Sequence, residues 1–261
     1  MTTGMAVILA LFIFSGCTKD DEPAPQIPPE SSFVMDFSDF SNADDTLGLR
    51  EVTTYQNWGY SYGTLIAWQT LLTVNLAVPV ATFGESFNHE AIYHPDADNW
   101  TWSYNVTVGM VVYEAELTGY LIPDSVVWEM RVTRGTDFSD FVWYYGRSAV
   151  DKSGGYWILQ ENPLNPSPLI RIDWHAYDDG TSDIKYTNVR PGVAENGTYI
   201  FYGTMIGDFN RFYHIYSNSL DNLTEIEWSS VNRNGHVKDP HHFGDDLWHC
   251  WDESLMDVVC P

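Results

Sequence analysis

The sequence predicts a mainly β protein, an antiparallel meander curled into a barrel or half-barrel around one buried helix. Apolar and polar residues alternate along most of residues 100–230, as expected of strands with one buried and one solvent-exposed face. Turn signals interrupt this alternation at short intervals and leave no room for the crossover helices that parallel strands need. One segment before residue 80 shows apolar residues at helical spacing instead.

Length and composition narrow the class of protein. A chain of 261 residues suits one large domain. Its 12 basic and 36 acidic residues give a net charge of -24, which repels nucleic acid and anionic membrane surfaces. We interpret the acidity as a solubility device. The 11 Trp, 16 Tyr and 13 Phe residues agree with a sheet and suit contact with a ligand or sugar.

The chain begins with a segment typical of exported proteins. The apolar run 6–14 is too short to span a membrane, so residues 1–16 are predicted to be a signal peptide. The sequence Ser15, Gly16, Cys17 resembles the lipobox of bacterial lipoproteins, in which a small residue precedes a lipidated cysteine. The resemblance implies that Cys17 is lipidated and becomes the mature N-terminus. An ordinary signal sequence with an incidental cysteine is the alternative.

The next residues indicate where the protein is delivered. Lys19, Asp20, Asp21 and Glu22 resemble the export tag by which one group of Gram-negative bacteria sends lipoproteins to the outer face of the outer membrane. The resemblance implies a lipid-anchored protein exposed at the cell surface; a simple solvated tether is the alternative. Four prolines within residues 23–29 predict an extended spacer. We therefore divide the mature chain into a lipidated tether, 17–32, and a single β-rich domain, 33–261.

One helix is expected over Thr64–Leu76. Thr64 can cap it and Pro79 would end it. Its apolar stripe consists of Leu65, Trp68, Leu72 and Leu76. Apolar residues off the stripe indicate that the helix is covered on most sides. Polar residues and Pro79 interrupt the segment. We therefore favour a buried helix that packs on the sheet, and a second membrane segment is the less favoured alternative.

Nine to eleven strands are expected, near the number that closes a small barrel. They lie near residues 34–37, 100–108, 111–117, 126–132, 141–145, 156–159, 170–174, 184–189, 199–206, 212–216 and 225–228. The segments 141–145 and 156–159 are apolar on both faces, which places them beside the helix. Three prolines in 162–168 predict a long rim loop. In outline the meander is similar to a lipocalin-like barrel or to the helix-plugged half-barrel of bacterial lipoprotein carriers.

The C-terminal segment concentrates side chains that bind metals. The candidate ligands are His236, His241, His242 and His249. Imidazole and carboxylate groups suit a divalent metal, which is the one candidate cofactor. Their spacing matches no known metal motif, so a polar tail with exposed histidines is the preferred interpretation. The chain also carries no nucleophile motif of a hydrolase, and no catalytic residue is assigned.

The two C-terminal cysteines predict a disulfide. Cys250 and Cys260 are the remaining pair once Cys17 is lipidated, and thiols outside the cytoplasm oxidise. Closing this loop should stabilise the fold by about 2–3 kcal/mol. Metal-bound thiolates beside His249 are the alternative.

Three functions remain open at this stage. The first is a non-enzymatic binding module for a small apolar, lipid or sugar ligand. Its candidate contacts are Trp102, Tyr104, Trp128, Trp143 and Trp174. The second is a structural lipoprotein whose exposed aromatics meet a partner in an outer-membrane assembly. The third is a metal-dependent hydrolase built on the C-terminal His and Asp residues. The expected partners are thus the membrane, through the anchor, and a ligand or an outer-membrane protein.

Overall fold

The computed structural model describes residues 23–41 and 55–261. The predicted signal peptide, the predicted lipidation site Cys17 and the expected export tag lie outside the described residues.

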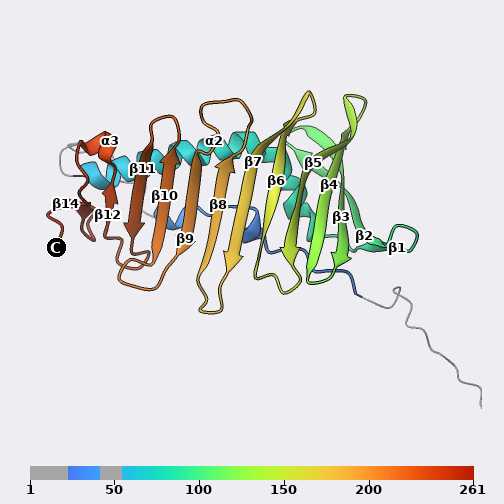
Figure 1. Cartoon of the computed structure of the whole chain (residues 1–261), viewed down its shortest axis with the longest axis horizontal. Helices are drawn as coiled ribbons and strands as arrows, with labels where there is room; N and C mark the ends of the chain where they lie inside the picture. The colour runs from blue at the N-terminus through green and yellow to red at the C-terminus, as the bar shows by residue number, and fades with distance from the viewer. Residues whose placement is uncertain (1–22, 42–54) are drawn as a thin grey trace, which may run out of the picture.

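The described strands form one antiparallel sheet in strict chain order, as the alternation predicts. The two edge strands do not pair with each other, so the sheet is an open, curled half-barrel (Figure 1). The strands are β1 (Ile92–His94), β2 (Asn99–Val108), β3 (Val111–Ile122), β4 (Ser125–Arg134), β5 (Phe138–Ala149), β6 (Gly154–Asn162), β7 (Asn165–Ala176), β8 (Ser182–Asn188), β9 (Tyr199–Thr204), β10 (Arg211–Ser217), β11 (Asn222–Trp228), β12 (Gly235–Lys238), β13 (His249–Trp251) and β14 (Asp257–Val258). The helical elements are η2 (Glu30–Ser32), α1 (Ser38–Ser41), α2 (Gln56–Ser86) and α3 (Pro240–Phe243).

Strands β2 to β11 are the ten that the sequence predicts between residues 100 and 228. The sheet also contains β1 and β12 to β14, which the sequence did not reveal. None of these four exceeds four residues, and a two-residue period cannot be recognised over so short a run.

One face of the sheet is apolar and covered. In β2, for example, Trp102 and Tyr104 are buried whereas Ser103 and Asn105 are exposed. The largest fully buried side chains of the inner face include Trp128, Trp157, Tyr144, Ile172, Ile200 and Tyr213. The expectation that residues 141–145 are covered on both faces is wrong, because Tyr145 is 37% exposed on the outer face.

Helix α2 runs across one face of the half-barrel and contacts β2 near one edge of the sheet and β12 to β14 near the other (Figure 1). At its N-terminal end the Asp257 carboxylate accepts hydrogen bonds from the backbone N–H groups of Gln56 and Asn57, at 3.0 and 2.9 Å. At the other end the Tyr104 hydroxyl donates to the Thr82 carbonyl oxygen. The helix therefore joins the two ends of the open sheet.

The helix is longer than the predicted Thr64–Leu76 segment at both ends. It begins at Gln56 because Asp257, 201 residues later in the chain, supplies its N-terminal acceptor. It also continues through Pro79, which was expected to end it. Proline there removes one N–H donor, but the helix continues to the buried Phe83, whose ring packs against Trp157 with centroids 5.4 Å apart.

Only one face of α2 is covered. Leu65, Leu72, Leu76 and Phe83 are buried, whereas Leu71 and Val74 are 52% and 73% exposed. The expectation of cover on most sides is therefore wrong, because only the side that faces the sheet is covered. By length and composition α2 is the one helix among the described residues that could cross a membrane.

Residues 23–41, hereafter the strap, lie against the sheet beside α2. A strand was expected at residues 34–37, and the structure has none there. The segment is instead held by tyrosine hydroxyls. The Met35 N–H donates to the Tyr186 hydroxyl at 3.0 Å, and that hydroxyl donates to the Phe33 carbonyl at 2.6 Å. The alternation of buried Phe33 and Met35 therefore reflects an extended chain with side-chain partners.

The proline-rich part of the strap also packs onto the domain instead of standing away from it. Pro28 is buried, and the Gln26 side chain accepts a hydrogen bond from Lys152 on the turn between β5 and β6.

The long loop expected at residues 162–168 is a tight turn followed by the start of β7. Pro166 and Pro168 are tolerated in this strand because its first residues pair with β6 on one side, whereas pairing with β8 begins at Ile170. Irregular register near Gln160 accommodates the prolines.

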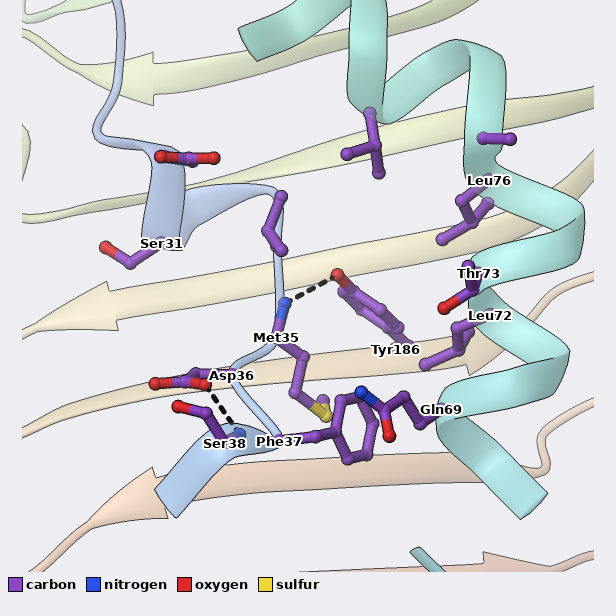
Figure 2. A pocket seen from close by; sticks show the side chains of 14 residues that line it. Ser31, Met35, Asp36, Phe37, Ser38, Gln69, Leu72, Thr73, Leu76 and Tyr186 are labelled. Atoms are coloured by element: carbon purple, nitrogen blue, oxygen red, sulfur yellow. Dashed lines mark hydrogen bonds between the residues drawn. The ribbon is translucent and has the colours of Figure 1, made fainter. Parts of the chain in front are cut away.

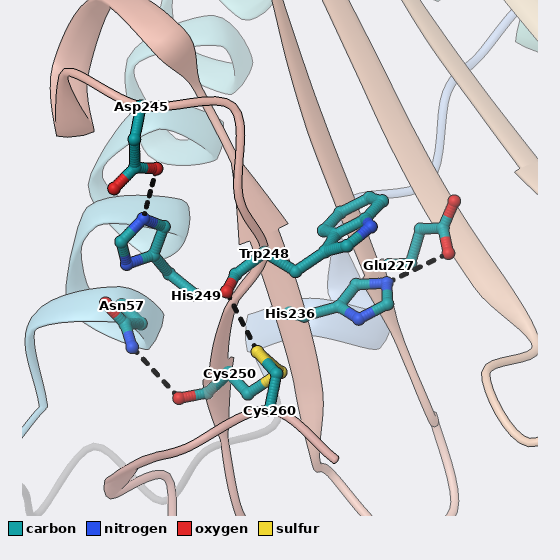
Figure 3. The surroundings of a disulfide bond; sticks show 8 residues. All are labelled: Asn57, Glu227, His236, Asp245, Trp248, His249, Cys250 and Cys260. Atoms are coloured by element: carbon teal, nitrogen blue, oxygen red, sulfur yellow. Dashed lines mark hydrogen bonds and ion pairs between the residues drawn. A yellow bond between two sulfur atoms is a disulfide. The ribbon is translucent and has the colours of Figure 1, made fainter.

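The disulfide between Cys250 and Cys260 is confirmed (Figure 3). Their Cα atoms are 5.2 Å apart. The Cys250 carbonyl also accepts a hydrogen bond from the Asn57 side chain at 2.9 Å, so the bridge lies beside the first turn of α2.

Replacing both cysteines, Cys250→Ser with Cys260→Ser, should lower the free energy of unfolding by about 2–3 kcal/mol, because the unfolded chain regains the entropy of an open loop. Urea unfolding of the oxidised protein and of the double variant measures the difference. Equal stability of the two proteins would contradict a structural role for the bridge.

Candidate functional site

A cavity of about 570 Å³ lies between the strap and α2; we call it the strap groove (Figure 2). Its helix wall consists of Gln69, Leu72, Thr73, Leu76, Ala77 and Val80, and its strap wall of residues 30, 31 and 34–38. Tyr186 from β8 stands between the two walls. The helical repeat brings these α2 side chains to one flank, while the Tyr186 hydrogen bonds fix the opposite wall.

The polar residues of the strap groove carry either negative charge or none. Glu30 and Asp36 contribute carboxylates, and the rest are Ser31, Ser38, Gln69, Thr73 and the Tyr186 hydroxyl. Among the described lining residues there is no Lys, Arg or His. This groove therefore offers an apolar interior and an acidic margin, which disfavours an anionic ligand.

A second cavity, of about 360 Å³, lies along the opposite flank of α2; we call it the rim groove. Its lining comprises Trp68, Leu71, Leu72 and Asn75 from α2, Leu169 and Ile170 from β7, Tyr186, Thr187 and Asn188 from β8, and Glu195 and Thr198 from the loop before β9. Leu72 and Tyr186 line both grooves.

Chemically, the described lining of the two grooves suits binding better than catalysis. Burial raises the pKa of the Tyr186 hydroxyl, and the bond from the Met35 N–H offsets only part of this effect. The hydroxyl therefore stays protonated at neutral pH and continues to hold the strap. No histidine or cysteine lines either groove among the described residues. The candidate general bases there are the exposed carboxylates of Glu30, Asp36 and Glu195, and no thiol nucleophile accompanies them.

The five aromatic residues proposed from the sequence as ligand contacts line neither groove. Trp102, Trp128 and Trp174 are buried in the core. The Trp128 indole N–H donates to Ser148, and Tyr104 binds the end of α2. Trp143 packs against Phe138 and Phe141. The groove residues that the sequence did not reveal are mostly small or aliphatic. The feature of the sequence that could have indicated them is the absence of charged residues from residue 56 to residue 84.

The four candidate metal ligands are not brought together. His236 pairs with Glu227, and His249 with Asp245, both at 3.0 Å (Figure 3). His241 and His242 lie on α3. Within the described residues no group of three or more His, Cys, Asp or Glu side chains is arranged to hold a metal ion.

Asp239 gives the C-terminal segment a structural role. This buried carboxylate caps α3 through the His241 and His242 N–H groups and accepts hydrogen bonds from Thr224 and Tyr60. Burial acts to raise its pKa, but these hydrogen bonds outweigh burial and the pKa is lowered. Asp239 therefore joins α3 to α2 and β11.

On the outer face, Glu227 lies between two histidines. Its carboxylate is 3.6 Å from His214 Nε2 and 3.0 Å from His236 Nε2. These two imidazoles lower the pKa of Glu227 to about 2, against a smaller opposing effect of burial. His236 also stacks on Trp248, with ring centroids 3.8 Å apart. This cluster lies on the face of the sheet that α2 does not cover.

Comparison of the chain with models of protein families, with curated proteins and with solved structures finds no match. The geometry of the two grooves and the sequence of residues 1–22 are therefore the basis for a functional proposal.

The Tyr186 hydroxyl should contribute strongly to holding the strap. Tyr186→Phe leaves a buried N–H and a buried carbonyl without their partner, which should lower the free energy of unfolding by about 2 kcal/mol and speed hydrogen exchange at the Met35 amide. Tyr216→Phe, which removes an exposed hydroxyl bound to Asp221, is the control. Equal effects of the two substitutions would contradict this role.

The Glu227 pKa predicts a specific loss of stability in acid. Because the folded-state pKa, about 2, lies below the unfolded value of 4.5, the unfolded chain takes up the proton first. The stabilisation is complete above about pH 4.5 and is lost as the pH falls towards 2. Over this pH range the unfolding free energy of Glu227→Gln should therefore decrease by about 1–2 kcal/mol less than that of the parent protein. Glu253→Gln, at an exposed site, is the control, and an unchanged acid profile in Glu227→Gln would be the contrary result.

Proposed function

We propose that this protein is a lipid-anchored lipoprotein of the outer membrane that binds the hydrocarbon part of a neutral amphiphile in the strap groove. The observation that carries the proposal is the apolar cavity of about 570 Å³ between the strap and α2. Its volume is within the range of pockets that bind small molecules.

The walls of the groove suit a hydrocarbon chain. Leu72, Leu76 and Val80 from α2 face Val34 and Met35 of the strap. Each buried methylene of a ligand contributes about 0.8 kcal/mol through its removal from water, so a chain of moderate length binds without specific polar contacts. A sugar would need more hydrogen-bond partners and exposed aromatic rings, and the inner-face tryptophans are already packed in the core.

The charge at the groove favours a neutral head group. Glu30 and Asp36 lie at its margin with no basic lining residue described, and the chain as a whole carries a net charge of -24. A fatty-acid carboxylate would meet repulsion there, whereas an alcohol or an ester would not.

The proposed anchor would bring the groove near a source of such molecules. Six positions separate Cys17 from Pro23, the first described residue of the strap. An extended chain of that length reaches at most about 20 Å, so a lipidated Cys17 would keep the domain close to the membrane surface. The lipobox-like sequence and the acidic tag support this location.

The interaction protein remains the second candidate because Leu71 and Val74 expose apolar surface on α2. A hydrolase built on the C-terminal histidines has less support, since His236 and His249 pair with separate carboxylates and His241 and His242 lie on α3.

Binding of a fluorescent long-chain alcohol to the purified protein tests the proposal. Ala77→Trp places a large side chain in the strap groove from an exposed position on α2 and should weaken binding at least about tenfold. Thr107→Trp, on the outer face of β2, is the matched control and should bind as the parent does. The fatty acid of equal length should bind less tightly than the alcohol.

Absence of binding by the parent protein would refute the proposal. An equal loss of affinity in Ala77→Trp and Thr107→Trp would place the ligand outside the strap groove and would refute it as well.

A further inference from the structure

We infer that the natural ligand carries two hydrocarbon chains, one lying in the strap groove and the other in the rim groove, with its uncharged linking group crossing over α2. This inference rests on the proposed function and extends it by naming the class of ligand as a neutral two-chain lipid.

The helical repeat shows that the two grooves are the two flanks of one helix. With about 100° of rotation per residue, Leu72 points towards the sheet, and Thr73, Leu76 and Ala77 follow on one side of it. Trp68, Leu71 and Asn75 lie on the other side. The first set lines the strap groove and the second set lines the rim groove.

The two grooves meet at the same two side chains. Leu72 and Tyr186 line both cavities, and both are buried. Figure 2 shows Leu72 directed towards the Tyr186 ring between helix and strap. A chain in the strap groove and a chain in the rim groove would therefore touch opposite sides of this pair, and a molecule on one side alone would leave the second apolar cavity unfilled.

The exposed side of α2 between the grooves can accommodate the small polar group that joins the two hydrocarbon chains of the ligand. Thr70 and Val74 lie on the side of the helix opposite Leu72 and are exposed, and no charged residue occurs in α2 before Glu85. The Thr70 hydroxyl and the Asn75 amide N–H already donate to backbone carbonyls within the helix. Their oxygens remain acceptors for a hydroxyl group of a ligand.

Charge at the second groove agrees with that at the first. Glu195 lies at the margin of the rim groove, and the lining residues include no basic side chain among those described. Both chains would therefore belong to a molecule whose head group is neutral, such as a diacylglycerol, because a phosphate would face Glu30, Asp36 and Glu195 without a cationic partner.

Native mass spectrometry of the full chain, released from detergent in the gas phase, can count the bound chains. Monoacylglycerol and diacylglycerol of equal chain length are the probes. The parent should bind two monoacylglycerol molecules or one diacylglycerol molecule, and diacylglycerol should bind at least about tenfold more tightly, because one molecule then buries two chains.

Two variants test the rim groove separately. Asn75→Trp and Leu71→Trp each place a large ring in it from an exposed position of α2. Both should reduce the monoacylglycerol count from two to one and remove the advantage of diacylglycerol. Thr107→Trp is the control for an added tryptophan, and unchanged circular dichroism establishes that the variants fold.

The outcomes separate this inference from the proposed function. A parent that binds one monoacylglycerol, with no preference for diacylglycerol and no effect of Asn75→Trp or Leu71→Trp, overturns the two-chain inference while leaving single-chain binding in place. A parent that binds neither probe overturns both proposals.

Discussion

The structure depends on one geometric constraint: a single helix has to cover the apolar face of a wide sheet. A strand of twelve residues such as β7 is about 40 Å long, whereas a helix with its side chains is about 10 Å wide. Helix α2 therefore shields a band across the strands, and the strap shields a second band beside it (Figure 1). The apolar grooves that flank α2 follow from this difference in width. Hydrogen bonds between the sheet and both ends of α2 hold the helix in place between the two grooves.

The sheet itself was predictable because its signal is local. The alternation of apolar and polar residues located most of the strands from β2 to β11, because successive residues of a strand point to opposite faces. The errors arose where distant groups decide the local structure. The Tyr186 hydroxyl, 151 residues from Met35, replaces a strand partner for the strap, and Asp257 extends α2 by supplying its N-terminal acceptor. No local pattern encodes such pairings.

The candidate site was harder to predict for a related reason. Aromatic residues suit ligand contacts, but in this sheet Trp128 and Trp174 are buried in the core. The groove is instead lined by residues such as Ala77 and Val80, which are unremarkable in a sequence. What distinguishes them is that α2 carries no charged residue before Glu85 although it is covered on one side only. This property becomes informative once the exposed side is known.

The central claim is that the space beside α2 is a ligand site and not a defect of packing. A crystal structure of the full chain after equilibration with a neutral long-chain amphiphile tests this directly. We predict elongated density between the strap and α2, in contact with Leu72, Leu76 and Val80, with the Tyr186 hydroxyl still bound to Met35 and Phe33. A groove closed by the protein's own side chains, or one that holds only water, would contradict the claim.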